Sequence, residues 1–217
     1  VKFLCAHGYQ VYLVDFGNPQ HAPHLGLKDY AAGMLPEALT AVRQNSNVQD
    51  VTLLGYCMGG LFALIYAGWS GDKHIRNIVT IASPIDMKAA GPAAKLLQAM
   101  ERPAALVRRF TKFRVHNIAP EKLAVPGRVS ALIFKMTNPM GTMQGYLDLL
   151  MNMWDRKYVT EYQTMNTWFN QMLDYPGGIV QDFMVHVGLD NALATGHIRF
   201  GKEHSADLTK ITANYLA

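Results

Sequence analysis

The chain has 217 residues, of which half are hydrophobic and 17% are charged, and its formal net charge is +4. That length is most simply one domain with a substantial core, and its scattered lysines and arginines argue against a nucleic-acid-binding face. Its two cysteines lie far apart, which excludes a disulfide framework and gives no metal-binding spacing.

The N-terminal part of the chain alternates helical and strand patterns. Residues 3–8 are predicted to be the end of a helix, and Cys5 within them is interpreted as a packing residue. Residues 10–15 form an apolar run that predicts a buried strand. Residues 29–43 carry apolar side chains at helical spacing, with Pro36 either kinking the helix or starting its second half.

A strand, a helix and another strand come next. Residues 51–54 and 75–82 predict strands, and residues 61–67 predict a buried helix between them. Strands and helices that alternate at this spacing predict a parallel sheet with helices on both faces. The run 51–71 is uncharged and long enough for a membrane span, but its glycines favour a buried strand followed by a buried helix.

The pattern then becomes mostly helical. Residues 1–85 are predicted to be part of an α/β core, residues 86–207 a helical cap or lid inserted into it, and residues 208–217 the start of the next core strand. Apolar residues of the insertion recur at helical spacing and are interpreted as facing inward. They are Leu96, Leu97 and Met100, then Leu147, Leu150, Met151 and Trp154, and then Met165, Trp168, Phe169 and Met172.

The stretch Gly55-Tyr56-Cys57-Met58-Gly59-Gly60 lies between the strand at 51–54 and the helix at 61–67. It has the spacing of a nucleophile elbow, G-x-S-x-G, with cysteine in the serine position. We expect Gly55 and Gly59 to let strand and helix approach closely where a Cβ would clash.

A thiol at this position has the surroundings of a nucleophile. Cys57 would lie at a helix N-terminus, where the macrodipole and unpaired N–H groups favour the thiolate. The N–H of Met58 would form the first half of an oxyanion hole. The alternative is that Cys57 is a small buried hydrophobic residue, as most free cysteines are.

The rest of a catalytic triad is not found in this chain. In this architecture an acid and then a histidine follow the nucleophile, but the chain ends at the next strand, and its start lacks the earlier strand with its oxyanion loop. We therefore expect a fragment truncated at both ends. His186, His197 and His204 are interpreted as structural or surface residues, although a substitute base among them stays open.

The elbow and its flanks resemble the polyhydroxyalkanoate synthase family. The hexapeptide around Cys57 resembles that family's cysteine-containing lipase box. Residues 1–19 and 78–86 are similar to the segments before and after the box. Residues 154–155, followed by residues 161–168, look like cap helices of the shorter, class III type.

The resemblance implies an α/β-hydrolase core with a cap and an acyltransferase that polymerises (R)-3-hydroxyacyl-CoA through an acyl thioester on Cys57. It further implies that Met58 contributes its backbone N–H, that no cofactor or metal is needed, and that the fragment alone is inactive. The implied partners are the growing polyester and a second synthase subunit, in a homodimer or a heteromer. The expected location is the cytoplasm, at the surface of polyester granules.

Two other functions stay open. A cysteine-dependent α/β-hydrolase of the dienelactone hydrolase or esterase type has the same elbow, but such enzymes lack a long cap at this place. A non-catalytic binding protein of polyester granules would keep the apolar cap and would need no thiolate.

Overall fold

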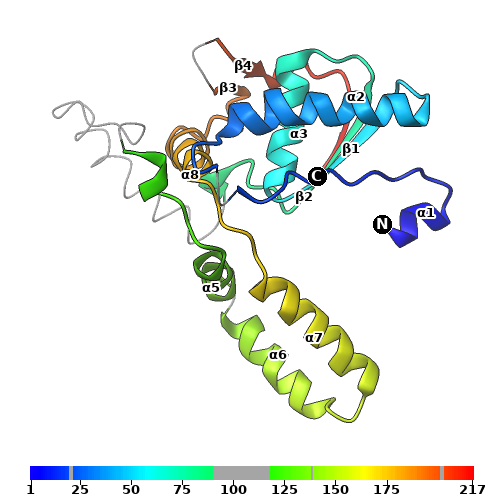
Figure 1. Cartoon of the computed structure of the whole chain (residues 1–217), viewed down its shortest axis with the longest axis vertical. Coiled ribbons are helices and arrows are strands. Elements are labelled where there is room, and N and C mark those ends of the chain that lie inside the picture. The colour runs from blue at the N-terminus through cyan, green and yellow to red at the C-terminus, as the bar shows by residue number, and fades with distance from the viewer. Residues whose placement is uncertain (20–21, 90–117, 138, 201–202) are drawn as a thin grey trace.

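The computed structural model describes residues 1–19, 22–89, 118–137, 139–200 and 203–217 (Figure 1). A parallel sheet and the helix α3 (Met58–Ser70) lie at the centre of the molecule. A helical arm, made of α5 (Gly127–Thr137), α6 (Pro139–Met151) and α7 (Arg156–Asn170), projects away from this centre.

The described sheet contains β1 (Val51–Tyr56), β2 (Ile75–Ile81) and β5 (Asn214–Leu216), in the order β1-β2-β5 and all parallel. These strands confirm the predictions for 51–54 and 75–82. Within the C-terminal ten residues, the strand is limited to Asn214–Leu216, and Leu208–Lys210 form a short 3-10 helix. Tyr56 lies opposite Ile81 in the register, so the carboxyl ends of β1 and β2 meet at one edge. This edge carries the candidate site.

Helices cover one face of the sheet in the described parts of the chain. Leu53 and Gly55 of β1 are buried on the face that α3 covers, whereas Leu54 and Tyr56 alternate to the other face and are exposed. The expectation of helices on both faces is therefore not met in the described residues, where Leu54 and Tyr56 leave the second face of β1 exposed.

The N-terminal segment differs from its prediction in two ways. The predicted helix exists as α1 (Lys2–Ala6), but it buries none of its residues. Cys5 is exposed, so its interpretation as a packing residue is wrong. Residues 10–15 belong to no strand, and Leu13 is 79% exposed. An apolar run favours a strand only where a ladder partner exists, and β1 pairs with β2 alone among the described strands.

The helix predicted over 29–43 is confirmed as two consecutive pieces. A π-helical stretch, η2 (Asp29–Met34), continues into α2 (Leu35–Ser46), and Pro36 occupies the first turn of the second piece. Proline fits there because the first N–H groups of a helix have no intrahelical partner. Asn47, in the left-handed conformation, ends the helix.

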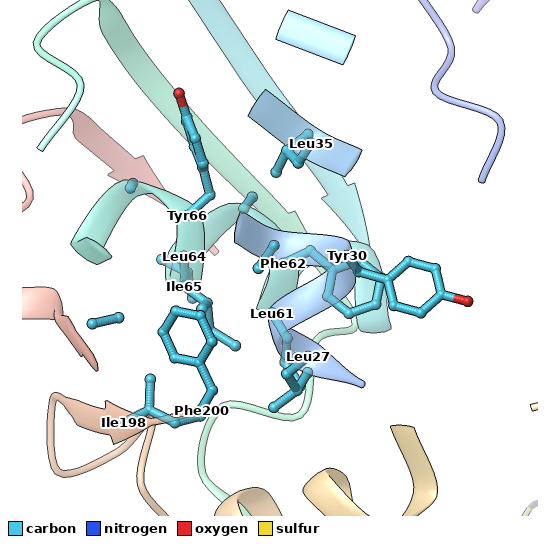
Figure 2. Packing of buried hydrophobic residues seen from close by; sticks show 14 of the residues in the cluster. Leu27, Tyr30, Leu35, Leu61, Phe62, Leu64, Ile65, Tyr66, Ile198 and Phe200 are labelled. Carbon is cyan, nitrogen blue, oxygen red and sulfur yellow. The ribbon is translucent and has the colours of Figure 1, made fainter. Parts of the chain in front are cut away.

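The core is built around α3, which is apolar on all sides (Figure 2). Helix α3 contacts the strands β1 and β2, η2, β4 (Ser205–Asp207) and η7 (Leu208–Lys210). Leu61 and Ile65 are fully buried. This packing explains the uncharged run at 51–71 as a core strand and helix. None of the helices in the described residues combines the length and apolar composition that crossing a bilayer requires.

Between β2 and β5 the described chain is largely helical, as the sequence predicts. Its elements are η3 (Met87–Ala89), η5 (Pro120–Lys122), α5, α6, α7, α8 (Gly177–Asp182), the π-helical η6 (Phe183–Leu189), β3 (His197–Arg199), β4 and η7. Strands β3 and β4 form a separate antiparallel pair.

The apolar side chains of the arm do not face inward. Those at 147, 150, 151, 154, 165 and 168 are exposed, and Trp154 is 89% exposed. The prediction that these residues face the core is wrong, because α6 and α7 contact each other and α5 but not the sheet. Phe169 and Met172 are half-buried. The predicted pattern at Leu96, Leu97 and Met100 lies outside the described residues.

Candidate active site at the elbow

Cys57 is the single residue between β1 and α3, and its backbone is strained. Its φ of 52° and ψ of −116° lie where L-residues are rarely found, at a cost of about 1–3 kcal/mol. The Cys57 N–H donates to the Ile81 carbonyl at 2.8 Å, and the Gly60 N–H donates to the Cys57 carbonyl at 3.1 Å. These bonds hold the sharp turn that the elbow sequence predicts.

Two glycines make room for the turn, and they are not the pair that the sequence suggests. A Cβ on Gly55 would lie 2.5 Å from the carbonyl carbon and oxygen of Gly59, which are backbone atoms. A Cβ on Gly60 would lie 2.9 Å from the Ser83 Cβ. A Cβ on Gly59 would meet nothing within 4 Å. The prediction is confirmed for Gly55 and wrong for Gly59, because the close approach on the helix side occurs one residue later.

The N-terminus of α3 adjoins the thiol-bearing residue in the chain. The helix starts at Met58 directly after Cys57, has no side-chain cap and carries no acidic residue in its first turn. Its first N–H groups and the positive end of its dipole are therefore free to act on a negative charge at Cys57. Cys57 is half-buried. The role of the Met58 N–H in an oxyanion hole stays a prediction.

The end of β2 completes this edge of the sheet. Ala82, the residue after β2, also has a positive φ of 51°. Four residues later, Asp86 accepts hydrogen bonds from the Asn191 Nδ2 at 2.9 Å and from the Lys88 N–H at 2.9 Å. These bonds hold the pKa of Asp86 below its usual range, with the Asn191 bond as the largest cause. The Asn191 bond links the segment directly after β2 to the segment that follows η6.

Tyr175 is a half-buried residue that the sequence did not single out. It lies just before α8 and packs against the core. Burial raises the pKa of Tyr175, and the charge of Cys57 raises it further. The local sequence around Tyr175, Asp174-Tyr175-Pro176-Gly177-Gly178, indicates a turn and gives no sign of this packing.

In the described parts of the chain, no hydrogen bond or ion pair joins Cys57 to a histidine or a carboxylate. His186 lies between Asp182 and Asp190, at 3.9 and 4.0 Å. The other two histidines considered as a substitute base also have partners elsewhere. His197 lies 3.5 Å from Asp207, and the His204 ring lies 5.5 Å from that of Trp69. Among the described residues, no group of three or more histidines, cysteines and carboxylates could hold a metal ion.

Comparison with known proteins agrees with this geometry. A family model described as the alpha/beta hydrolase fold matches residues 2–182. The Poly(3-hydroxyalkanoate) polymerase subunit PhaC of Allochromatium vinosum is 28% identical over 219 residues, covering 100% of this chain and 58% of that protein. The subunit of the same name from Synechocystis is 28% identical over 98% of this chain and 54% of its own length. That from Thiocystis violacea is 28% identical over 93% and 54%. The chain thus spans about half the length of these curated relatives.

Proposed function

Because the chain belongs to the alpha/beta hydrolase fold family and carries a thiol at the elbow, we propose that it provides the nucleophile of a polyhydroxyalkanoate-type acyltransferase. The observation that carries the proposal is the strained, half-buried Cys57 at the uncapped N-terminus of α3. The relatives named as polymerase subunits support the substrate class, a (R)-3-hydroxyacyl thioester of CoA.

The proposed first step is thioester exchange. The Cys57 thiolate attacks the thioester carbonyl, the Cys57 sulfur–acyl bond forms, the bond from the carbonyl to the CoA sulfur breaks, and CoA leaves as its thiolate. The N–H groups at the start of α3, that of Met58 first, would hold the negative charge that develops on the carbonyl oxygen. One thioester replaces another, so the acyl group stays activated.

The proposed second step extends the ester. The hydroxyl of another 3-hydroxyacyl group attacks the acyl–Cys57 thioester, an ester bond forms, and the thiol of Cys57 is released with the hydroxyl proton. Excluding water would favour this transfer over hydrolysis. The step uses the thiol and the two acyl groups, so we propose no cofactor and no metal for it.

We also propose a partner subunit and a location for the reaction. The relatives are named as polymerase subunits, which supports a homodimer or a heteromer with a second synthase subunit. The exposed apolar side chains of α6 and α7 are compatible with contact to such a subunit or to the growing polyester at a cytoplasmic granule.

The first step can be tested on this chain without assigning a base, because alkaline pH alone generates thiolate. The chain is incubated at about pH 9 with (R)-3-hydroxybutyryl-CoA, and acyl adducts are located by mass spectrometry of peptides. We expect one 3-hydroxybutyryl group on Cys57 in the wild type and in Cys5→Ala, and none on Cys57→Ala. An adduct on Cys5 alone, or no adduct at all, would remove the proposal.

Analysis of the reaction product distinguishes an acyltransferase from a hydrolase. In a version extended to the length of its relatives, we expect ester-linked oligomers, whereas free 3-hydroxybutyric acid as the sole product would assign a hydrolase. A protein that releases no CoA and leaves Cys57 unmodified would instead fit a non-catalytic granule protein.

A further inference from the structure

The chain that leaves β2 contacts the elbow directly. The Ile81 carbonyl accepts the Cys57 N–H at 2.8 Å, so it fixes the backbone of the residue that carries the thiol. Ser83 lies against the start of α3, since a Cβ on Gly60 would come within 2.9 Å of the Ser83 Cβ. The position of Cys57 therefore depends on the path of the chain after β2.

This part of the chain needs an anchor, because Ala82 within it is strained. Ala82 has a φ of 51°, in the left-handed region that alanine keeps only where the surrounding contacts hold it. On one side of Ala82, Ile81 belongs to the ladder between β1 and β2. On the other side, the Ile85 N–H donates to the Ser83 carbonyl at 2.9 Å, which closes a local turn. A local turn does not fix the chain to the rest of the fold, so the anchor must lie further along.

Asn191 supplies this anchor with both ends of its side-chain amide. Its Oδ1 accepts the Met87 N–H at 2.9 Å, and its Nδ2 donates to the Asp86 Oδ1 at 2.9 Å. The same Asp86 oxygen accepts the N–H groups of Lys88 and Ala89, at 2.9 and 3.3 Å. We call this set of bonds the Asp86–Asn191 clamp. It joins several consecutive residues to one amide.

The other side of the clamp is part of the core. Asn191 is 6% exposed, and Ala192 and Leu193 directly after it belong to the buried hydrophobic cluster. The Ala192 N–H donates to the His186 carbonyl at 2.8 Å, which ties this loop to η6. Asn191 has a φ of 49°, and asparagine is one of the residues that tolerate the left-handed conformation. The clamp thus fastens the chain after β2 to a buried part of the fold.

We propose that Asn191 is a positioning residue, whose two side-chain hydrogen bonds hold the chain after β2 in place and thereby keep the Cys57 thiol at the N-terminus of α3. The inference rests on the proposed role of Cys57 as nucleophile. Without the clamp, Ala82 is free to relax to a negative φ, and the Ile81 carbonyl then shifts away from the Cys57 N–H. The thiol loses the turn that places it where the thiolate is favoured.

The test is hydrogen exchange of the Cys57 amide, followed by NMR, in Asn191→Asp. This substitution replaces the donating amide by a second carboxylate facing Asp86. We expect the Cys57 amide to exchange about tenfold faster than in the wild type, while the Ile65 amide in the middle of α3 keeps its rate. Asn47→Asp is the matched control, because Asn47 is also left-handed, with a φ of 56°, and it should leave the Cys57 amide unchanged.

A reversed pair distinguishes positioning by the clamp from a general loss of packing. When Asp86→Asn is combined with Asn191→Asp, an amide at position 86 again donates to a carboxylate at position 191, and acceptor oxygens remain for the neighbouring N–H groups. We expect the exchange rate of the Cys57 amide to return to within about twofold of the wild-type rate. Asn191→Asp should also slow alkylation of Cys57 by iodoacetamide at pH 7 about threefold to tenfold relative to Cys5, and the reversed pair should restore that ratio.

Unchanged exchange of the Cys57 amide in folded Asn191→Asp, or a defect that the reversed pair does not repair, would overturn the inference. Faster exchange with an unchanged alkylation ratio would also overturn it, because the clamp would then hold the backbone without affecting the thiol. If Asn191→Asp does not fold, Asp86→Ala takes its place, since Asp86 is exposed and its side chain is not part of the core. The same faster exchange is expected there, and a wild-type rate would contradict the clamp.

These comparisons do not depend on the proposed function. The exchange rates test the clamp whether or not Cys57 reacts with a thioester. Slow alkylation of Cys57 in the wild type, or the absence of an acyl group on it, would instead count against the proposed function itself.

Discussion

At the scale of single residues, the elbow requires glycine wherever a Cβ would collide with backbone atoms, which cannot rotate away. A Cβ on Gly55 would collide with backbone atoms of Gly59, whereas a Cβ on Gly59 would meet open space. The sequence places glycines at both positions and makes them look equivalent. Only the path of the chain shows that one is required by packing and the other is not.

A pair of alanine substitutions separates the two glycines. Gly55→Ala should lower the free energy of unfolding by about 3 kcal/mol or more, because the new Cβ collides with backbone. Gly59→Ala lies in α3 and should leave that free energy unchanged or raise it by up to about 1 kcal/mol, since alanine is the better helix former. Urea denaturation of both variants gives the comparison, and equal losses would show that the elbow geometry is incorrect.

The elbow and the segment before α8 differ in how far the sequence reveals them. Cys57 is recognisable because the apolar strand, the glycines and the apolar helix are adjacent in the chain. The position of Tyr175 is not, because it depends on a bridge to Val125 and on the packing of α8, which are tertiary contacts. Local patterns carry no information about such contacts.

At the scale of elements, the end of α3 is fastened to α2 by a half-buried carboxylate. Asp72 accepts from the Arg43 Nη2 at 2.7 Å and from the Tyr66 hydroxyl at 2.8 Å. Burial alone would raise the pKa of Asp72, but the bonds from Arg43 and Tyr66 outweigh it and hold the pKa below its usual range. A carboxyl whose pKa is lowered by folding stabilises the protein above its unfolded pKa, and this stability is lost as pH falls through the folded pKa.

Asp72→Asn should therefore destabilise the protein at neutral pH and much less in acid. We expect the free energy of unfolding at pH 7 to fall by about 1–3 kcal/mol, and the difference from the wild type to shrink as the pH falls below the ordinary pKa of an aspartate, about 4. Urea unfolding at pH 7 and pH 3 measures both values. A double-mutant cycle with Arg43→Met isolates the ion pair, and a difference that is independent of pH would contradict the assigned bonding.

Elements could be predicted where neighbouring residues decide them and not where distant ones do. The helix over 29–43 and the strands β1 and β2 follow from periodicity and length. The segment 10–15 has the composition of a strand but lies outside every described strand, because pairing depends on which edge another strand presents. A strand near the C-terminus is predictable because it continues the alternation of the core, and the structure pairs β5 with β2 in parallel.

At the scale of the whole molecule, apolar side chains are found in two places, a buried core and an exposed helical arm. Leu61 in α3 is 0% exposed and Leu150 in α6 is 64% exposed, although both lie in apolar helical stretches. Periodicity shows which side of a helix is apolar, but it does not show what covers that side. That limit explains why the inward-facing prediction failed for the arm.

The same substitution at these two leucines tests the division. Leu61→Ala should cost about 2–5 kcal/mol of unfolding free energy, because it removes fully buried carbons and leaves a cavity. Leu150→Ala should change it by less than about 0.5 kcal/mol in the isolated chain. Chemical denaturation at low protein concentration measures both, and a large loss for Leu150→Ala would mean that the arm folds onto other parts of the molecule.

The most direct measurement of the nucleophile is a competition between the two cysteines for limiting iodoacetamide at pH 7. Cys5 is exposed and Cys57 only half-buried, so accessibility alone would make Cys5 react faster. We predict that Cys57 is alkylated about fivefold faster or more, because the helix N-terminus stabilises its thiolate. Alkylation of Cys5 at a higher rate than Cys57, in the order of their exposure, would contradict a reactive thiol at the elbow.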